Sequence, residues 1–138
     1  MEPMEEGGWG HLRPEARNWL RQAEADWQVA EATFAAGLYF ACAFACHQTV
    51  EKGLKGAVIA RLRQAPPRAH NLVELGHLLG APEIVLTDLR YLNPEYVTSR
   101  YPDAANGVPA ENYDTAIAQS LMEAARRVRG WLRSALTG

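Results

Sequence analysis

The sequence predicts an all-α protein, and three observations support this prediction. Apolar residues recur at helical spacing along three long segments, near residues 15–36, 39–63 and 110–136. Proline and glycine residues separate these segments, and no stretch shows the strict alternation of apolar and polar residues that is typical of a strand. The chain has 138 residues, 48% of them apolar, which is enough to bury a core without disulfide bonds.

We expect residues 1–13 to form a flexible leader and residues 14–138 to form one domain. The start of the chain is acidic and has no apolar run, so it does not resemble a signal peptide. No segment approaches the roughly 18 consecutive apolar residues of a membrane span. Two cysteines, Cys42 and Cys46, suit a reducing compartment as free thiols and do not form a metal-ligand pattern. The sequence therefore predicts a cytoplasmic protein that binds no membrane, no metal and no cofactor.

The first helix is expected to begin at Pro14 and to end at Gly37. Proline is tolerated in the first turn of a helix, and the acidic residue beside it suits the helix dipole. Between these limits apolar residues recur every three or four positions, which is helical spacing. They are Ala16, Trp19, Leu20, Ala23, Trp27, Ala30 and Phe34.

The second helix, near residues 39–63, is apolar on two sides and should therefore be buried on both. Glycine inside a helix costs about 1 kcal/mol relative to alanine. Gly53 and Gly56 therefore indicate tight packing, either within the bundle or across a dimer interface. We also expect a symmetric homodimer, because this helix is apolar on two sides and the chain contains four tryptophans.

A short third helix is expected from Leu72 to Leu79, capped by Asn71 or His70, and a further helical piece should continue to about Leu92. The next segment, residues 93–109, is rich in proline, glycine and asparagine and shows no periodicity. A loop of this length in a compact domain is often functional.

The last helix is expected near residues 110–136, with one apolar face and a series of arginines on another. We expect the arginines to form a solvated face, although a track for phosphate groups is the alternative. The arginines are Arg126, Arg129 and Arg133, and the apolar face contains Tyr113, Ile117, Leu121, Ala124, Val128, Trp131 and Leu132.

A candidate site starts from His47 and Glu51, which lie one turn apart on the apolar face of the second helix. An ionised carboxylate in such a place needs a cationic partner. Arg100, in the long loop, is the expected partner, and the favoured interpretation is an ion pair that holds the loop to the bundle. The alternative is a site for a phosphate-bearing ligand. Lys55 follows Glu51 by four residues, which is a favourable helix pair, although a solvated edge is expected for it and for Lys52.

Three separated motifs resemble those of the HEPN domain family. They are ACAFACHQTVEKGLK at residues 41–55, AHNLVEL at residues 69–75 and TSRYPD at residues 98–103, in the family's order. This resemblance implies an up-and-down bundle of four to five helices, like HEPN domains and nucleotidyltransferase substrate-binding subunits. It also implies a homodimer. Many members of this family are ribonucleases of toxin–antitoxin systems, and others act with a minimal nucleotidyltransferase.

The resemblance also locates a departure from the family's ribonuclease pattern. Active members carry an arginine followed, four to six residues later, by a histidine. Arg100 matches the arginine, but Ala105, Asn106 and Gly107 occupy the positions of the histidine. A histidine can transfer a proton near neutral pH, whereas an asparagine side chain can only form hydrogen bonds. Cleavage of RNA by the usual route is therefore not expected.

The resemblance and the residues together predict a HEPN protein that binds nucleotide or RNA and acts with a separately encoded minimal nucleotidyltransferase in a toxin–antitoxin-like pair. Two alternatives remain, namely a metal-independent ribonuclease toxin with an altered site and a purely structural dimerisation module. Arg100 and Glu51 are the catalytic candidates if the protein is an enzyme. The candidate ligand-binding residues are His47, Lys52, Arg100, Tyr101, Asp103 and Asn106.

Overall fold

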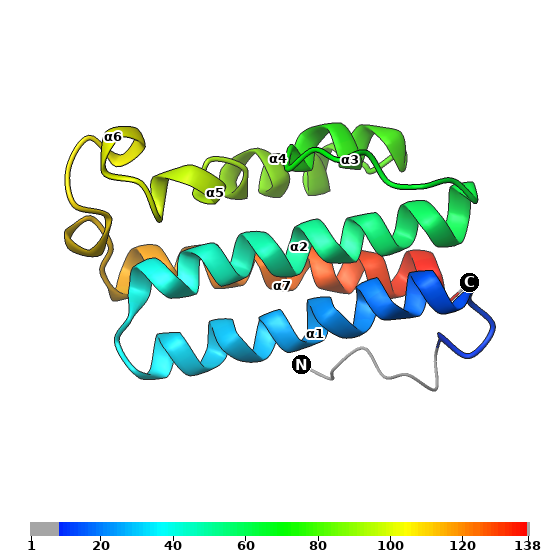
Figure 1. Ribbon diagram of the computed structural model, residues 1–138, viewed down its shortest axis with the longest axis horizontal. Helices are drawn as coiled ribbons and strands as arrows, with labels where there is room; N and C mark the ends of the chain where they lie inside the picture. Colours follow the sequence, from blue (N-terminus) through cyan, green and yellow to red (C-terminus); the bar gives the residue numbers. More distant parts are fainter. Residues whose placement is uncertain (1–8, 138) are drawn as a thin grey trace.

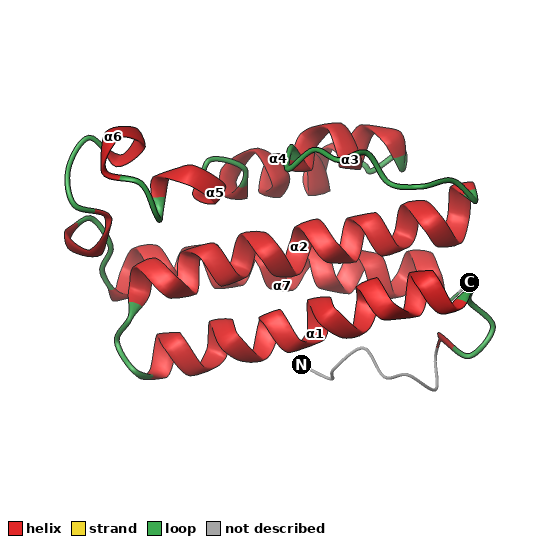
Figure 2. Cartoon of the chain, in the orientation of Figure 1, coloured by secondary structure: helices red, strands yellow, loops and turns green. Residues whose placement is uncertain are grey.

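The computed structural model describes residues 9–137, and within them every regular element is a helix (Figure 2). Three long helices form the body of the bundle, with shorter ones on one side of it (Figure 1). The long helices are α1 (Pro14–Ala35), α2 (Tyr39–Leu62) and α7 (Thr115–Leu136). The shorter ones are α3 (Leu72–Leu78), α4 (Glu83–Leu92), α5 (Glu95–Thr98) and α6 (Pro102–Ala105). The prediction of an all-α bundle is confirmed.

Helix α1 begins and ends where the sequence predicts. Pro14 occupies its first turn, and Gly37 follows its end with a φ of 77°, a left-handed conformation that glycine adopts easily. The buried residues follow helical spacing and turn one stripe toward α2. They are Ala16, Leu20, Ala23, Trp27 and Ala30. Trp9 is also buried, at 2% exposure, so packing against the core begins within the segment expected to be a flexible leader. Residues 1–8 of that segment lie outside the described residues.

Helix α2 lies at the centre of the bundle and contacts α1, α7 and α3 (Figure 1). It is buried on almost every side, as its two apolar faces predict. A Cβ atom added at Gly53 would lie 2.8 Å from Leu132 of α7, and one at Gly56 would lie 3.0 Å from Leu20 of α1. Of the two alternatives for these glycines, the structure therefore shows tight packing inside the bundle.

Helices α3 and α4 form a short pair that covers α2 and α7. The side chain of Asn71 caps α3 by accepting hydrogen bonds from the backbone N–H groups of Val73 and Glu74. The side chain of Asn93, just after α4, accepts one more from the N–H of Leu72 and so joins the two helices. Of the two residues expected to cap this helix, Asn71 is the one that does so, which leaves the His70 side chain available for other contacts.

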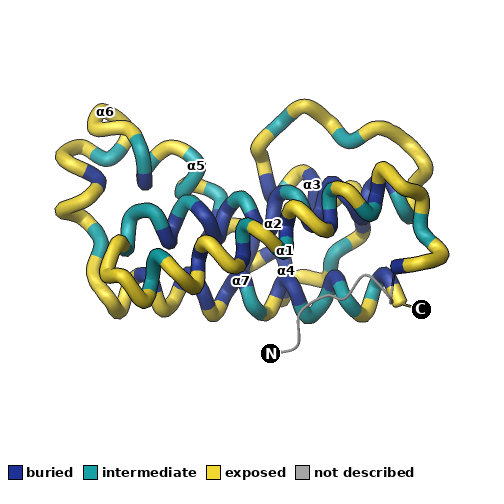
Figure 3. The backbone as a smooth tube through the Cα atoms, turned by 60° about the horizontal axis from the view of Figure 1, so that its bottom comes forward, coloured by how far each residue is buried: buried dark blue, intermediate teal, exposed yellow. Residues whose placement is uncertain are grey.

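The segment between α4 and α7 is more ordered than the expected loop. It contains α5, α6 and a 3₁₀ turn, η2 (Pro109–Glu111), and is largely exposed around α6 (Figure 3). The last long helix begins at Thr115 instead of near residue 110. Its start is set by Asp114, whose side chain accepts a hydrogen bond from the N–H of Ile117.

The core face of α7 differs from the expected one at two positions. Ile117, expected to be buried, is 40% exposed. Arg129, expected on a solvated face, is 2% exposed and forms an ion pair of 2.6 Å with Glu24 of α1. The expectation of a solvated arginine face is therefore wrong for Arg129. Within the described residues, no helix is both long enough and apolar enough to cross a bilayer.

Candidate functional site

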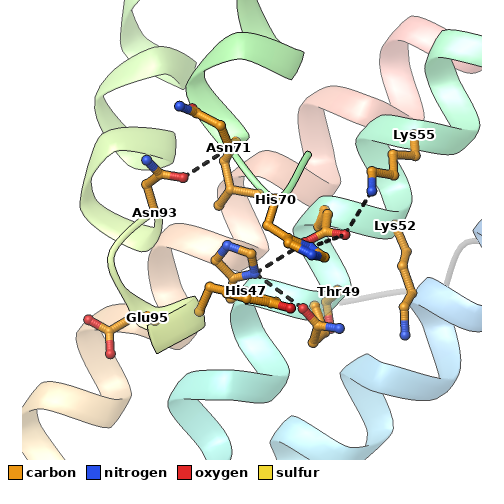
Figure 4. A network of polar contacts seen from close by, with 12 residues as sticks. His47, Thr49, Lys52, Lys55, His70, Asn71, Asn93 and Glu95 are labelled. Carbon is orange, nitrogen blue, oxygen red and sulfur yellow. Dashed lines mark hydrogen bonds and ion pairs between the residues drawn. The ribbon is translucent and has the colours of Figure 1, made fainter. Parts of the chain in front are cut away.

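The carboxylate of Glu51 is the centre of a polar network on the side of α2 that faces α3. Glu51 is 3% exposed, as its place on an apolar face predicts. Lys55, one turn later on α2, places its Nζ atom 3.0 Å from Oε2 of Glu51. His70 places its Nδ1 atom 2.9 Å from Oε1 and 3.1 Å from Oε2 (Figure 4). Because Lys55 is itself buried, the solvated edge expected for it is wrong.

His70 reaches this carboxylate from the segment that precedes α3. Its side chain is 47% exposed, and its ring stacks on Tyr96 of α5 with a centroid distance of 3.9 Å and an interplanar angle of 14°. The second ring nitrogen, Nε2, forms no hydrogen bond with any described residue. Because the carboxylate of Glu51 is the acceptor, the Nδ1–H group of His70 is the donor in this contact.

His47 lies one turn before Glu51 on α2, with its Nδ1 atom 3.7 Å from Oε1 of Glu51, and is fully buried. Burial lowers the pKa of His47, and the nearby carboxylate of Glu51 opposes that shift only in part. Its Nδ1 atom lies 3.3 Å from the side-chain oxygen of Gln48, and its Nε2 atom has no hydrogen-bond partner among the described residues. His47 is therefore a neutral group inside the bundle, with its ring 5.5 Å from that of Tyr96.

Arg100 does not form the expected ion pair with Glu51. Its Nε atom donates a hydrogen bond of 2.9 Å to the backbone carbonyl of Tyr96. Its guanidinium carbon lies 4.3 Å from the ring centroid of Phe44, 4.5 Å from that of Tyr96 and 4.8 Å from that of Tyr101. The correction has a physical reason, since Lys55 and His70 already satisfy the carboxylate while three aromatic rings surround the arginine. The terminal guanidinium nitrogens of Arg100 form no hydrogen bond or ion pair with any described residue.

Arg100 lies on the wall of a cavity of about 520 Å³ between α1, α2 and the segment that contains η2. The cavity is mainly apolar, and Gln48 and Ser99 supply polar groups beside the arginine. Its volume falls within the range of small-molecule sites, roughly 300–1,000 Å³. The other lining residues are Asp26, Val29, Phe40, Ala41, Phe44, Ala45, Val108, Pro109 and Ala110.

The remaining candidate residues do not join this cavity as a group. Lys52 forms an ion pair of 2.7 Å with Asp26, which does line the cavity, and its side chain points toward α1 (Figure 4). Tyr101 contacts Arg100 but is 47% exposed. Asp103 accepts a hydrogen bond from the N–H of Ala104 within α6. Asn106 ends α6 in the left-handed conformation, with a φ of 55°.

Two residues of the site were not identified as candidates from the sequence. His70 was expected only to start a helix, and Tyr96 was not singled out. The AHNLVEL motif could have pointed to His70. Asn71 alone is sufficient to cap the helix, so the histidine beside it is not needed as a cap. Tyr96 could have been identified from its position four residues before Arg100, because this spacing puts two side chains on the same side of a helical turn.

Comparisons with known proteins agree with this architecture. The model of the HEPN domain family matches residues 16–135. The crystal structure of TT1696 from Thermus thermophilus has a TM-score of 0.83 and 27% sequence identity, covering 90% of this chain and all of that one. The structure of ST0689, described as an archaeal HEPN homologue, has a TM-score of 0.74 and 29% identity, covering 88% of this chain and 97% of that one. No curated protein sequence matches significantly.

The fold defines a helical bundle protein with a polar network around Glu51 on its central helix. The chain belongs to the HEPN domain family, because the family model extends over nearly the whole bundle. The first two motifs that carry the resemblance meet at this network, and Tyr96 links it to the third motif. Glu51 comes from the first motif, His70 from the second and Arg100 from the third, and Tyr96 contacts both His70 and Arg100.

Proposed function

We propose that the protein binds a nucleotide or RNA at the cavity beside Arg100, and that it acts with a separately encoded minimal nucleotidyltransferase in a toxin–antitoxin-like pair. The observation that carries the proposal is the arginine whose terminal nitrogens have no partner among the described residues, at the wall of an apolar cavity. A guanidinium group can bind a phosphate through two parallel hydrogen bonds. The aromatic and aliphatic side chains of the cavity suit a nucleobase.

The proposed function does not use the family's Arg…His ribonuclease site. Asn106, at one of the positions where active members carry the histidine, ends a short helix and does not line the cavity. Its amide does not titrate, so it cannot replace a histidine in proton transfer. The proposal therefore assigns binding to Arg100 and does not require the family's usual cleavage route.

Titration calorimetry with a 5′-mononucleotide and with a short single-stranded RNA tests the binding proposal. Arg100→Gln removes the charge and the paired donors, so we expect affinity for the phosphate-bearing ligands to fall at least tenfold, about 1.4 kcal/mol. Arg90→Gln is the control, because Arg90 pairs with Glu83 on an exposed surface. A wild-type protein that binds neither ligand, or an Arg100→Gln variant that binds as well as wild type, would contradict the proposal.

The assembly part of the proposal is a symmetric homodimer that recognises the nucleotidyltransferase. Exposed apolar side chains beside the cavity, among them Val29 and Val108, supply apolar area for such a contact. Sedimentation at micromolar concentration should show a dimer. Coexpression with a nucleotidyltransferase from a neighbouring gene should yield a complex that purifies as one species. A monomer in the first experiment, or two separate proteins in the second, would refute the corresponding part.

A further inference from the structure

The cavity beside Arg100 is also lined by two polar side chains, one from each of the two helices that form its wall. They are Asp26 of α1 and Gln48 of α2. Lys52 lies one turn after Gln48 on α2 and forms an ion pair of 2.7 Å with Asp26; its side chain points toward α1 (Figure 4). Since residues four apart are neighbours on a helix surface, this ion pair places the Asp26 carboxylate close to the Gln48 amide.

The carboxylate of Asp26 offers hydrogen-bond acceptors to a ligand in the cavity. Its Oδ1 atom accepts a hydrogen bond of 3.1 Å from Gln22, and its Oδ2 atom accepts the one from Lys52. A carboxylate has about four lone-pair sites, so each oxygen can accept one more hydrogen bond. Lys52 also balances the negative charge of Asp26, so the carboxylate repels a phosphate bound at Arg100 only weakly.

The amide of Gln48 offers a donor. Two oxygens lie near Nδ1 of His47, namely Oε1 of Gln48 at 3.3 Å and Oε1 of Glu51 at 3.7 Å. The hydrogen of the neutral ring therefore belongs on Nδ1, because on the buried Nε2 atom it would have no acceptor among the described residues. The oxygen of Gln48 is thus turned toward His47. Its amide nitrogen donates to no described residue and remains available to a ligand.

The order of these groups along α2 fits one nucleotide. The guanidinium of Arg100 lies 4.3 Å from the ring centroid of Phe44, and Gln48 follows Phe44 by one turn. Lys52, which contacts Asp26, follows one turn later. At 1.5 Å per residue, the eight residues from Phe44 to Lys52 span about 12 Å. The phosphate and the base of a single 5′-mononucleotide can bridge the distance from Arg100 to Gln48 and Asp26.

We propose that Asp26 and Gln48 make this cavity selective for guanine, so that its ligand is a guanine nucleotide or a guanosine of an RNA chain. This inference rests on the proposed binding function and names the base. The Watson–Crick edge of guanine presents one acceptor, O6, followed by two donors, N1–H and N2–H. The Gln48 amide donates to O6, and the Asp26 carboxylate accepts from both nitrogens. Adenine and cytosine would each place a ring-nitrogen lone pair against the carboxylate, and uracil has only one donor.

Titration calorimetry with GMP, IMP, AMP and ribose 5-phosphate tests this selectivity on the wild-type protein. GMP should bind at least about tenfold more tightly than AMP, because AMP leaves polar groups of the cavity opposed or unpaired. IMP keeps O6 and N1–H but lacks the 2-amino group, so its affinity should lie between the two. Ribose 5-phosphate has no base and should bind most weakly.

Two variants test the residues that contact the base. Asp26→Asn replaces an acceptor with a donor at constant size, so it should weaken GMP binding about tenfold. It should not weaken binding of AMP or ribose 5-phosphate, whereas general damage to the cavity would weaken all three. Gln48→Met removes the donor to O6 and should weaken GMP and IMP but not AMP. Asp88→Asn is the matched control, because Asp88 also pairs with a basic side chain, Arg127, but does not line the cavity.

Two short single-stranded RNAs, one with a single guanosine and one with adenosine in its place, distinguish the two sources of guanine. Tighter binding of the guanosine RNA than of GMP assigns the site to an RNA chain, and the reverse assigns it to the free nucleotide. Both results agree with selection of guanine. Equal binding of the two RNAs together with equal binding of GMP and AMP does not.

Three results would overturn the inference. Equal affinity of wild type for GMP and AMP would remove the selectivity and leave the proposed binding function intact. A preference for GMP that persists in both Asp26→Asn and Gln48→Met would show that other groups select the base. Absence of binding of every nucleotide and both RNAs by wild type would refute the proposed function and, with it, the selectivity that rests on it.

Discussion

The buried carboxylate of Glu51 explains why His70, which is distant from it in sequence, lies against α2. A carboxylate at 3% exposure needs positively charged or hydrogen-bonding partners, and this requirement was predictable from its place on an apolar helix face. The identity of the partners was not predictable in the same way. Lys55 follows from the spacing of four residues, whereas His70 depends on how the segment before α3 crosses α2.

The expected pairing of Arg100 with Glu51 fails for a related reason. Opposite charge made Arg100 a reasonable partner, but charge alone does not distinguish a carboxylate from a group of aromatic rings. Phe44, Tyr96 and Tyr101 provide such a group around the guanidinium. Because these contacts leave the terminal nitrogens of Arg100 without a partner among the described residues, the arginine can serve a ligand instead of the bundle.

His47 makes stability depend on pH. Its folded-state pKa is lowered by burial, so the unfolded chain takes up the proton first as the pH falls below about 6.5. The free energy of unfolding should therefore be fully retained above that pH and should decrease below it. Between pH 8 and pH 5.5 we expect wild type to lose about 1 kcal/mol more than His47→Gln, measured by urea denaturation. The exposed His77→Gln should keep the wild-type pH dependence, and equal losses in all three proteins would contradict this role of His47.

At the scale of helices, the sequence predicts α1 and α2 well and the start of α7 poorly. Apolar periodicity and clear breakers, such as Pro14 and Gly37, define the first two. Before α7 the residues from Ala110 onward are compatible with a helix. The actual start depends on the cap at Asp114 and on the turn η2, so a continuous helix from residue 110 was a reasonable but wrong prediction.

The glycines of the long helices allow a test of packing with an internal control. A Cβ at Gly56 would lie 3.0 Å from Leu20 and 3.2 Å from Cβ of Trp19, and these atoms are close to the α1 backbone and cannot move easily. Gly56→Ala should therefore lower the free energy of unfolding by about 1–2 kcal/mol, because overpacking exceeds the gain in helix propensity. A Cβ at Gly130 would meet nothing within 4 Å.

Gly130→Ala should raise the free energy of unfolding by about 0.5–1 kcal/mol, since only the helix propensity changes. Chemical denaturation of the two variants beside wild type measures both effects. The opposite signs make the comparison informative, because both substitutions add one methyl group to the interior of a long helix. If Gly56→Ala is as stabilising as Gly130→Ala, α1 and α2 are not packed as closely as the structure shows.

At the scale of the whole molecule, the fold was predictable because helical periodicity and three ordered motifs extend over most of the chain. The site was predictable only in part. Glu51 and Arg100 were singled out from residue type and position, but the residue that connects their surroundings, Tyr96, became visible only once α5 had been placed against α2. A single sequence says least about the contacts between distant segments, because neither apolar periodicity nor local spacing encodes these contacts.

The ion pair between Glu24 and Arg129 joins the first and last helices inside the bundle. Arg129 is 2% exposed, its guanidinium lies 4.5 Å from the ring centroid of Trp27, and burial lowers its pKa although Glu24 opposes that shift. Glu24→Gln keeps the size of the side chain but leaves the arginine charged, so we expect the free energy of unfolding to fall by roughly 3 kcal/mol. Adding Arg129→Met to Glu24→Gln should recover much of this loss, because methionine fills a similar volume without a charge.

Urea denaturation at neutral pH measures both variants, with Glu83→Gln as the control for an exposed ion pair. That pair, between Glu83 and Arg90, lies on the surface of α4, where solvent screens the interaction, so its loss should leave the unfolding curve unchanged. The double variant shows whether Glu24→Gln destabilises the protein through the buried charge of Arg129 or because any substitution at the α1–α7 contact is destabilising. If the double variant is less stable than Glu24→Gln alone, the contacts that Arg129 makes with Trp27 and its other neighbours stabilise the bundle more than its buried charge destabilises the Glu24→Gln variant.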